Sequence, residues 1–167
     1  QRSVALADTA RSRYLARRPA GTRRPLVAAS VGPYGATLHD GSEYRGDDGL
    51  REEELIDFHR ARFAVLAGAA PDLLACETIP SLREARALVR LLREHPTARA
   101  WLSFSCRDGA HTSAGDPLVA CAAMLDAEPQ VVAMGVNCVP PALVGEAVRA
   151  LASVSHKPIL AYPNSGE

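Results

Sequence analysis

Cys138 ends an apolar run in the stretch VNCVPP, residues 136–141, and its thiol is the first group in the sequence that could do chemistry. A deprotonated thiol is a nucleophile and a ligand for metals such as zinc. An isolated cysteine is more often a small core residue. The cysteines stand singly, without a CxxC pair, at Cys76, Cys106, Cys121 and Cys138. The residue types alone therefore leave Cys138 open as either a core thiol or a metal ligand.

Glu77 is the second candidate, because it follows the apolar run DLLAC and would share one strand face with Leu73 and Ala75. A carboxylate on the inner face of a sheet needs a cationic partner. The ammonium group of a substrate would provide one, and so would a neighbouring arginine or the amides of a helix N-terminus. We therefore take Glu77 as a candidate substrate-binding residue.

The elements that must position these residues are five apolar segments that alternate with segments of helical spacing. Strands are expected at residues 25–31, 72–76, 98–106, 130–136 and 157–162. Helices are expected at residues 2–18, 52–68, 81–95, 117–127 and 141–153. Ser81 followed by Glu84 predicts a capping box at the start of one helix.

This alternation predicts βαβ units on a parallel sheet, either doubly wound or a (β/α)8 TIM barrel. In WLSFSC, residues 101–106, Ser103 and Ser105 share a face with Trp101, whereas Leu102, Phe104 and Cys106 share the other. That division fits a barrel wall with helices outside. Because five strands cannot close a barrel that needs eight, we expect residues 1–167 to be a single partial barrel domain, truncated at both ends.

Polar residues gather at the expected carboxyl ends of the strands, where ligands bind in both folds. They occupy residues 32–35, 77–80, 105–109, 137–138 and 162–166. The irregular stretch of residues 32–49 is long for a βα loop, and loops of that length are usually functional. No glycine-rich phosphate loop occurs, and no histidine has a second ligand at metal spacing.

The charge balance narrows the class of partner. Nineteen Lys and Arg residues balance nineteen Asp and Glu residues, so the sequence has no excess of positive charge that would indicate binding to nucleic acid or to an anionic membrane. No segment approaches the roughly 18 consecutive apolar residues of a membrane span. The first 18 residues are charged throughout and unlike a signal peptide. We expect a cytoplasmic protein with a small-molecule partner, and the sequence does not indicate an oligomeric state.

Five motifs, in this order, resemble the homocysteine S-methyltransferase family. They are SVGPYGATLHDGSEYRGD, LLACETIPSLREARAL, AWLSFSCRDGAHTSAGDPL, VVAMGVNC and YPNSGE. The similarity covers nearly the whole chain. The loop DGSEYRG and the ending YPNSGE look most like the bacterial and plant members that take a methyl group from S-methylmethionine.

The resemblance implies a barrel enzyme, with about strands 3 to 7 present, that moves a methyl group from S-methylmethionine or S-adenosylmethionine to the zinc-activated thiolate of homocysteine, giving methionine. It implies that Cys138, in a Gly-x-Asn-Cys motif, is one of three thiolate ligands of Zn²⁺. Glu77 matches the glutamate that holds the homocysteine amino group. Asn137 would orient the site and Ser105 would line it. Since alternation places Asn137 and Cys138 on opposite faces, the chain must turn there if both serve.

The sequence departs from the family pattern because it has neither the later Gly-Gly-Cys-Cys pair nor the early Asp-Gly strand motif. Cys76 and Cys106 do not replace the pair, since alternation points them toward the helices. We expect two further ligands after residue 167, and we expect this chain alone to be inactive. Two other interpretations stay open. One is a metal-free barrel lyase or aldolase. A lysine at the carboxyl end of a strand would favour it, but Lys157 lies at the start of its strand. The other is a non-catalytic remnant that binds an amino acid or a partner.

Overall fold

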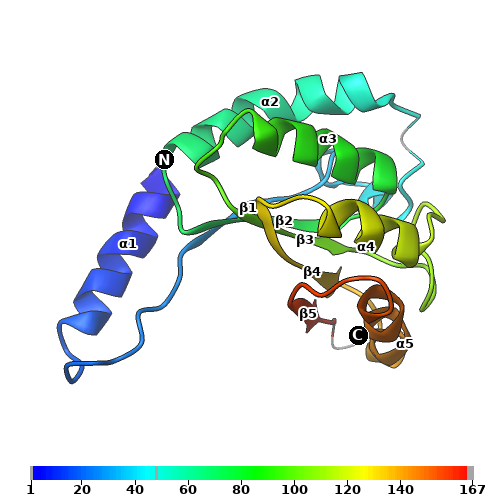
Figure 1. Cartoon of the computed structure of the whole chain (residues 1–167). Helices are drawn as coiled ribbons and strands as arrows, with labels where there is room; N and C mark the ends of the chain where they lie inside the picture. The colour runs from blue at the N-terminus through cyan, green and yellow to red at the C-terminus, as the bar shows by residue number, and fades with distance from the viewer. Residues whose placement is uncertain (1, 48, 165–167) are drawn as a thin grey trace.

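A parallel sheet of five strands forms the centre of the computed structural model, which describes residues 2–47 and 49–164 (Figure 1). The strands are β1 (Ala28–Val31), β2 (Leu73–Ile79), β3 (Ala100–Phe104), β4 (Val131–Asn137) and β5 (Ile159–Tyr162). The helices are α1 (Arg2–Leu15), α2 (Glu52–Gly68), α3 (Leu82–Arg93), α4 (Leu118–Asp126) and α5 (Pro141–Ala152). All ten predicted elements are therefore present, with ends that differ by a few residues.

The order of the strands decides between the two predicted folds. Each strand pairs in parallel with its neighbour in the sequence, in the order β1-β2-β3-β4-β5. A doubly wound sheet reverses its strand order at a switch point, whereas a (β/α)8 barrel does not. Helices α2 to α5 lie along one side of the sheet (Figure 1). The structure is therefore part of a (β/α)8 barrel, as the sequence predicted.

The two faces of β3 divide as the alternation predicted. Leu102 and Phe104 are fully buried in the core between the sheet and the helices. Trp101 and Ser103 point the other way, since each makes a hydrogen bond to the Tyr162 hydroxyl of β5. The apolar core thus lies on the helix side of the sheet, and the opposite face carries polar groups.

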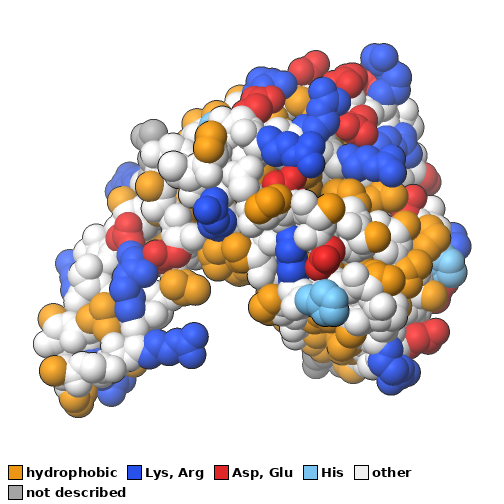
Figure 2. All heavy atoms as spheres, viewed as in Figure 1, with side chains coloured by type: hydrophobic (Ala, Val, Ile, Leu, Met, Phe, Trp, Pro, Cys, Tyr) orange, Lys and Arg blue, Asp and Glu red, His pale blue; other side chains and the backbone are white. Residues whose placement is uncertain are grey.

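Surface charges of both signs alternate over α2 and α3 (Figure 2). Arg90 on α3 pairs with Glu52 and Glu53 on α2, and Arg60 on α2 pairs with Glu94 just after α3. Exposed ion pairs of this kind contribute little to stability, about 0 to 1 kcal/mol each. None of the helices in residues 2–47 and 49–164 has the length and apolar character needed to cross a bilayer.

Helix α3 begins with only half of the predicted capping box. The Ser81 side chain accepts a hydrogen bond from the Glu84 amide at 3.1 Å, as predicted. The Glu84 carboxylate does not return to Ser81, because its Oε1 instead accepts from the Tyr34 amide at 2.6 Å and lies 2.8 Å from His59 Nε2. Glu84 is fully buried, so these partners offset the cost of desolvating its Oε1, whereas its Oε2 has no hydrogen-bond partner among the described residues. The side chain therefore fastens the long loop to the helix layer.

That loop, residues 32–49, contains two short 3-10 helices, η1 (Gly35–Thr37) and η2 (Ser42–Tyr44). The two pack backbone to backbone, since a Cβ atom placed on Gly35 would lie 2.5 Å from the Glu43 nitrogen. Arg62 of α2 donates to the Gly32 carbonyl oxygen at 2.6 Å and so holds the start of the loop. The stretch that was predicted to be irregular is thus an ordered loop with short helices.

Gly135 of β4 lies so close to Leu160 of β5 that a side chain would not fit between them. A Cβ atom on Gly135 would lie 1.9 Å from the Leu160 carbonyl oxygen, so we expect Gly135→Ala to lower the free energy of unfolding by about 1–3 kcal/mol. The matched control is Gly145→Ala on the exposed side of α5, where the nearest atom to a Cβ is 3.6 Å away. It should be neutral or stabilise by up to about 1 kcal/mol, because alanine is the better helix former. Urea denaturation measures both, and equal stability of the two variants would contradict the described β4–β5 packing.

Candidate functional site

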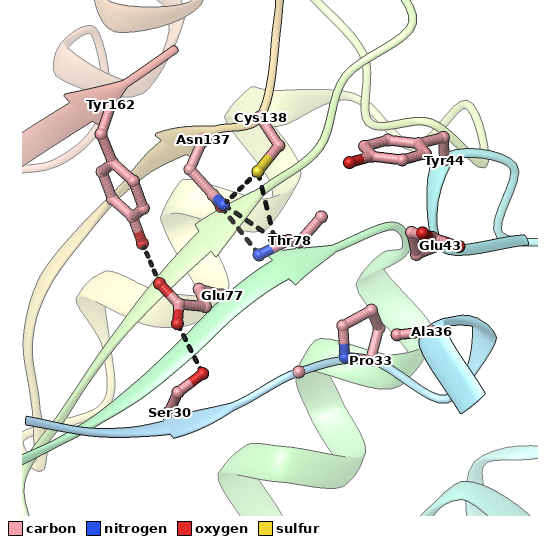
Figure 3. A pocket seen from close by; sticks show the side chains of 11 residues that line it. Ser30, Pro33, Ala36, Glu43, Tyr44, Glu77, Thr78, Asn137, Cys138 and Tyr162 are labelled. Atoms are coloured by element: carbon pink, nitrogen blue, oxygen red, sulfur yellow. Dashed lines mark hydrogen bonds between the residues drawn. The ribbon is translucent and has the colours of Figure 1, made fainter. Parts of the chain in front are cut away.

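A cavity of about 370 Å³ opens at the carboxyl ends of the strands (Figure 3). Residues from four strands and from the long loop line it, and they are Ser30, Gly32, Pro33, Ala36, Glu43, Tyr44, Glu77, Thr78, Asn137, Cys138 and Tyr162. Three of the four predicted site residues, Glu77, Asn137 and Cys138, therefore meet in one cavity. This edge is where enzymes of the barrel fold bind their ligands.

Cys138 and Thr78 both adopt left-handed backbone conformations, with φ of 52° and 63°. Such a conformation is unfavourable for a residue with a side chain, and most of all for a β-branched one such as threonine. At Cys138 it ends β4 and turns the chain, so that the side chains of Asn137 and Cys138 both line the cavity. The chain therefore turns at Cys138, as it must if Asn137 and Cys138 are both to face the cavity.

The Asn137 side chain joins three neighbouring strands. Its Oδ1 accepts hydrogen bonds from the Thr78 amide at 2.7 Å and from Ser103 Oγ at 2.7 Å. Its Nδ2 donates to Thr78 Oγ1 at 2.8 Å and to Cys138 Sγ at 3.3 Å. Because a backbone amide can only donate, the bond from Thr78 fixes which end of the Asn137 amide is the oxygen. The side chain is 1% exposed, and its whole hydrogen-bonding capacity is used.

The Cys138 sulfur accepts from two donors. Besides Asn137 Nδ2, Thr78 Oγ1 donates to Sγ at 3.7 Å, and its own oxygen accepts from Asn137 (Figure 3). Both donors lie beside a sulfur that lines the cavity and is not enclosed in the apolar core. The surroundings of Cys138 therefore suit a nucleophile or a metal ligand better than a core filler.

The other cysteines have different surroundings. Cys76 and Cys121 are buried in the core and Cys106 is largely buried beside it. Burial raises the pKa of each of these three thiols to about 12, because the charged thiolate is desolvated. None of them lines the cavity. The expectation that Cys76 and Cys106 cannot act as further ligands agrees with this arrangement.

Glu77 is held by hydroxyl groups and not by a cation. Its Oε1 accepts from Ser30 Oγ at 2.5 Å and its Oε2 accepts from the Tyr162 hydroxyl at 3.0 Å. Neither of the protein partners that the sequence offered, an arginine or helix N-terminal amides, bonds to this carboxylate within the described residues. Each oxygen keeps a further lone pair for a donor from the cavity.

Tyr162 connects this carboxylate to the Asn137 network. Its hydroxyl accepts from Trp101 Nε1 at 3.1 Å and bonds to Ser103 Oγ at 2.8 Å. Burial raises the pKa of Tyr162 to about 12, so its hydroxyl stays protonated and can donate. Ser103 and Tyr162 have one hydroxyl proton each, so when Ser103 donates to Asn137 and Tyr162 donates to Glu77, the 2.8 Å contact between the two hydroxyls carries no proton. The glutamate and the cysteine thus lie at two ends of one series of polar contacts.

Ser105, the fourth predicted site residue, lies behind the cavity wall and does not line it. Its Oγ donates to the Glu43 carbonyl oxygen at 3.1 Å and accepts from Ser113 Oγ at 2.9 Å. Ser105 therefore supports the loop that forms the wall, and direct contact with a substrate stays a prediction.

The sequence did not single out Thr78, Tyr162, Ser103 or Tyr44, which complete the cavity or its support. Thr78 and Tyr162 lay within the strand-end segments that were predicted to bind ligands. Their hydroxyl groups near strand ends could have marked them as site residues. Their hydrogen-bond partners, however, lie on other strands, so no single segment of the sequence identifies them. Ser165, Gly166 and Glu167 of the YPNSGE motif lie outside the described residues.

A metal at this cavity would need ligands beyond those described. Within residues 2–47 and 49–164, no three His, Cys, Asp or Glu side chains come together as a metal site. Among the described lining residues Cys138 is the one soft donor, and hydrogen bonds from Asn137 and Thr78 orient its sulfur. Lys157 donates to the Leu125 and Glu128 carbonyl oxygens near the start of β5, far along the strand from the cavity.

Comparison with known proteins gives consistent matches. Residues 1–167 match the family model described as Homocysteine S-methyltransferase. The homocysteine S-methyltransferase YbgG of Bacillus subtilis (strain 168) is 49% identical over 167 residues, which is 99% of this chain and 53% of that protein. The homocysteine S-methyltransferase of Escherichia coli (strain K12) is 51% identical over 167 residues, which again is 99% of this chain and 53% of that protein.

The solved structures agree. The crystal structure of the homocysteine methyltransferase MmuM from Escherichia coli, in its metallated form, superposes with a TM-score of 0.93 at 49% identity. The match covers 98% of this chain and 57% of that one. The chain thus spans about half the length of the relatives it matches.

The cysteines should differ in reactivity as their surroundings do. In metal-free protein at pH 8, we expect iodoacetamide to modify Cys138 at least about tenfold faster than Cys76, Cys106 or Cys121, whose thiols are protonated at that pH. Asn137→Asp should slow the reaction at Cys138, because it replaces a donor with a negative charge. A time course with peptide mass spectrometry measures each rate. Guanidinium-unfolded protein, in which the four rates should be similar, is the control, and equal rates in the folded protein would contradict the described burial.

Proposed function

Because this chain belongs to the homocysteine S-methyltransferase family, we propose that the protein containing it transfers a methyl group from S-methylmethionine or S-adenosylmethionine to the sulfur of homocysteine, giving methionine. The observation that carries the proposal is the cavity in which the Cys138 sulfur and the Glu77 carboxylate lie at two ends of one series of polar contacts. Residues 1–167 would form a single homocysteine-binding domain that is part of a barrel, with about strands 3 to 7 present.

Cys138 is proposed as one of three thiolate ligands of Zn²⁺, with two further cysteines after residue 167. The support is chemical, since this sulfur is the one soft donor among the described lining residues and two side chains hold it in place by hydrogen bonds. The metallated form of the Escherichia coli relative is consistent with a metal in this family. When bound, zinc would lower the pKa of the homocysteine thiol, so that it is present as a thiolate at neutral pH.

Glu77 would hold the ammonium group of homocysteine. Its two oxygens are fixed by Ser30 and Tyr162, which donate and so leave the carboxylate free to accept from an ammonium. Holding one end of a substrate while its sulfur lies near Cys138 converts the encounter into a reaction between oriented groups. Asn137 would keep Cys138 and Thr78 in place while this happens.

The reaction itself needs little more from the chain than orientation. The homocysteine thiolate attacks the methyl carbon in line, the new carbon–sulfur bond forms, and the bond to the sulfonium sulfur breaks with its electron pair. The leaving group is a neutral thioether, so no proton has to move in this step and no general base is required. This agrees with a cavity that offers no histidine or lysine among its described lining residues.

The proposed setting is the cytoplasm, in methionine biosynthesis. The described cysteines are all free, which suits a reducing compartment. The partners would be homocysteine and a sulfonium methyl donor, with neither nucleic acid nor a membrane involved, in keeping with a net charge of zero.

Removing the Cys138 sulfur should abolish metal binding and activity together. In the protein that includes the residues after position 167, Cys138→Ala should reduce bound zinc from about one per chain to near zero and slow methionine formation more than about a hundredfold. Atomic absorption and an assay of methionine with each sulfonium donor measure the two quantities. Cys106→Ala is the matched control, because its thiol lies outside the cavity. Normal zinc content and activity in Cys138→Ala would refute the proposal.

Glu77→Gln should weaken homocysteine binding and leave the metal in place. Loss of a charged hydrogen-bond partner costs about 1.5–3 kcal/mol, so the KM for homocysteine should rise by about 10- to 100-fold. Steady-state kinetics at saturating methyl donor measure this, with zinc content determined in parallel. Glu53→Gln on the surface of α2 is the control. A KM that does not change would remove Glu77 from the substrate site.

A further inference from the structure

The cavity carries two carboxylates and no compensating base. Glu43 and Glu77 both line it, whereas none of the described lining residues is Lys, Arg or His. No ion pair within the described part of the chain involves either glutamate. Carboxylates that face a cavity without a cationic partner favour a cationic ligand, because such a ligand offsets their charge. Two such groups in one cavity suit two positive charges.

The two glutamates differ in how the protein satisfies them. Both Glu77 oxygens accept hydrogen bonds from hydroxyl groups. The Glu43 Oε2 is buried and has no hydrogen-bond partner among the described residues. An oxygen that the solvent does not reach cannot accept a hydrogen bond from an ammonium, but its charge still acts across the cavity. A cation in the cavity would therefore offset the charge of Glu43 without a hydrogen bond to this oxygen.

The position of Glu43 is fixed by its backbone. Ser105 Oγ donates to its carbonyl oxygen at 3.1 Å, and Gly35 packs so closely that a Cβ atom there would lie 2.5 Å from its nitrogen. The carboxylate therefore extends from a folded segment that Ser105, the residue after β3, supports. Ser105 thus supports the site by holding the Glu43 backbone and not by contact with a ligand.

Tyr44 adds an aromatic ring next to this carboxylate. It lines the cavity with its hydroxyl directed toward Cys138 (Figure 3), and it is 47% exposed at the opening. Burial of its hydroxyl raises the pKa of Tyr44, and the neighbouring Cys138 and Glu43 charges raise it further. The face of an aromatic ring attracts cations that cannot form strong hydrogen bonds. A sulfonium is such a cation, because its charge lies on a sulfur that carries only carbon substituents.

We propose that Glu43 and Tyr44 form the subsite for the sulfonium centre of the methyl donor and determine the preference for a cationic donor. This inference rests on the proposed methyl transfer. It divides the cavity between two ligands, with Glu77 holding the ammonium of the nucleophile and Glu43 and Tyr44 holding the charge of the donor. The transferred methyl group would then lie between the Tyr44 side and the Cys138 side of the cavity.

The test is the pattern of KM values in the zinc-loaded protein that includes the residues after position 167. Glu43→Gln and Tyr44→Leu should each raise the KM for S-methylmethionine and for S-adenosylmethionine by about tenfold, which is the effect of one lost cation contact. The KM for homocysteine should stay within about twofold of its original value. Tyr44→Phe keeps the ring and should keep the donor KM. Asp47→Asn is the matched control, since Asp47 lies in the same loop but does not line the cavity.

The outcomes separate this inference from the proposed function. A donor KM unchanged in both Glu43→Gln and Tyr44→Leu, while Glu77→Gln still raises the KM for homocysteine, would overturn the subsite and leave the methyltransferase intact. An increase in the KM for homocysteine alone would also overturn it. Absence of methyl transfer in the unchanged protein would overturn both. Calorimetric titration of S-methylmethionine into the folded variants checks the donor affinity directly if turnover is too slow to measure.

Discussion

The hydrogen bonds of the Asn137 side chain are the interaction on which the rest of the site depends. They connect β4 to the end of β2 and to the polar face of β3, and every donor and acceptor of the amide is used. A buried amide that is fully satisfied stabilises one arrangement and penalises others, because any displacement leaves polar groups without partners. The positions of Thr78 and Cys138, and through Ser103 that of Tyr162, follow from this one side chain.

The two carboxylates of the cavity, Glu77 and Glu43, are stabilised in different ways although both are partly buried. Glu77 is surrounded by hydroxyl donors from β1 and β5, so its charge is supported before any ligand arrives. Glu43 has its backbone held firmly while one carboxylate oxygen stays buried and unbonded. The contrast follows from where each residue lies, one within a strand and one in the short helix η2.

The sequence was sufficient for the fold because its signals are local. The period of apolar residues gave the strands and helices, and the division of polar from apolar residues in WLSFSC gave the face of β3 that the site occupies. Cys138 and Glu77 could be found because each ends an apolar run. The conformations of Thr78 and Cys138 could not be derived, since a left-handed threonine or cysteine is stable only where neighbouring strands hold it. Glu84 shows the same limit, because its partners, the buried His59 and the Tyr34 amide, come from other segments and replace the predicted bond to Ser81.

The left-handed conformation of Thr78 has a consequence for how such a protein can change over generations. Strain of this kind costs about 1–3 kcal/mol, and glycine would relieve it. Glycine would also remove the hydroxyl that accepts from Asn137 Nδ2 and donates to the Cys138 sulfur. Leaving a buried amide without its acceptor costs about 1–3 kcal/mol, which is as much as the strain that glycine would relieve. Stability alone therefore gives little reason to prefer either residue, and selection for the chemistry of Cys138 decides between them. A copy of the gene released from that selection should accept changes at this residue early, before the core of the barrel begins to change.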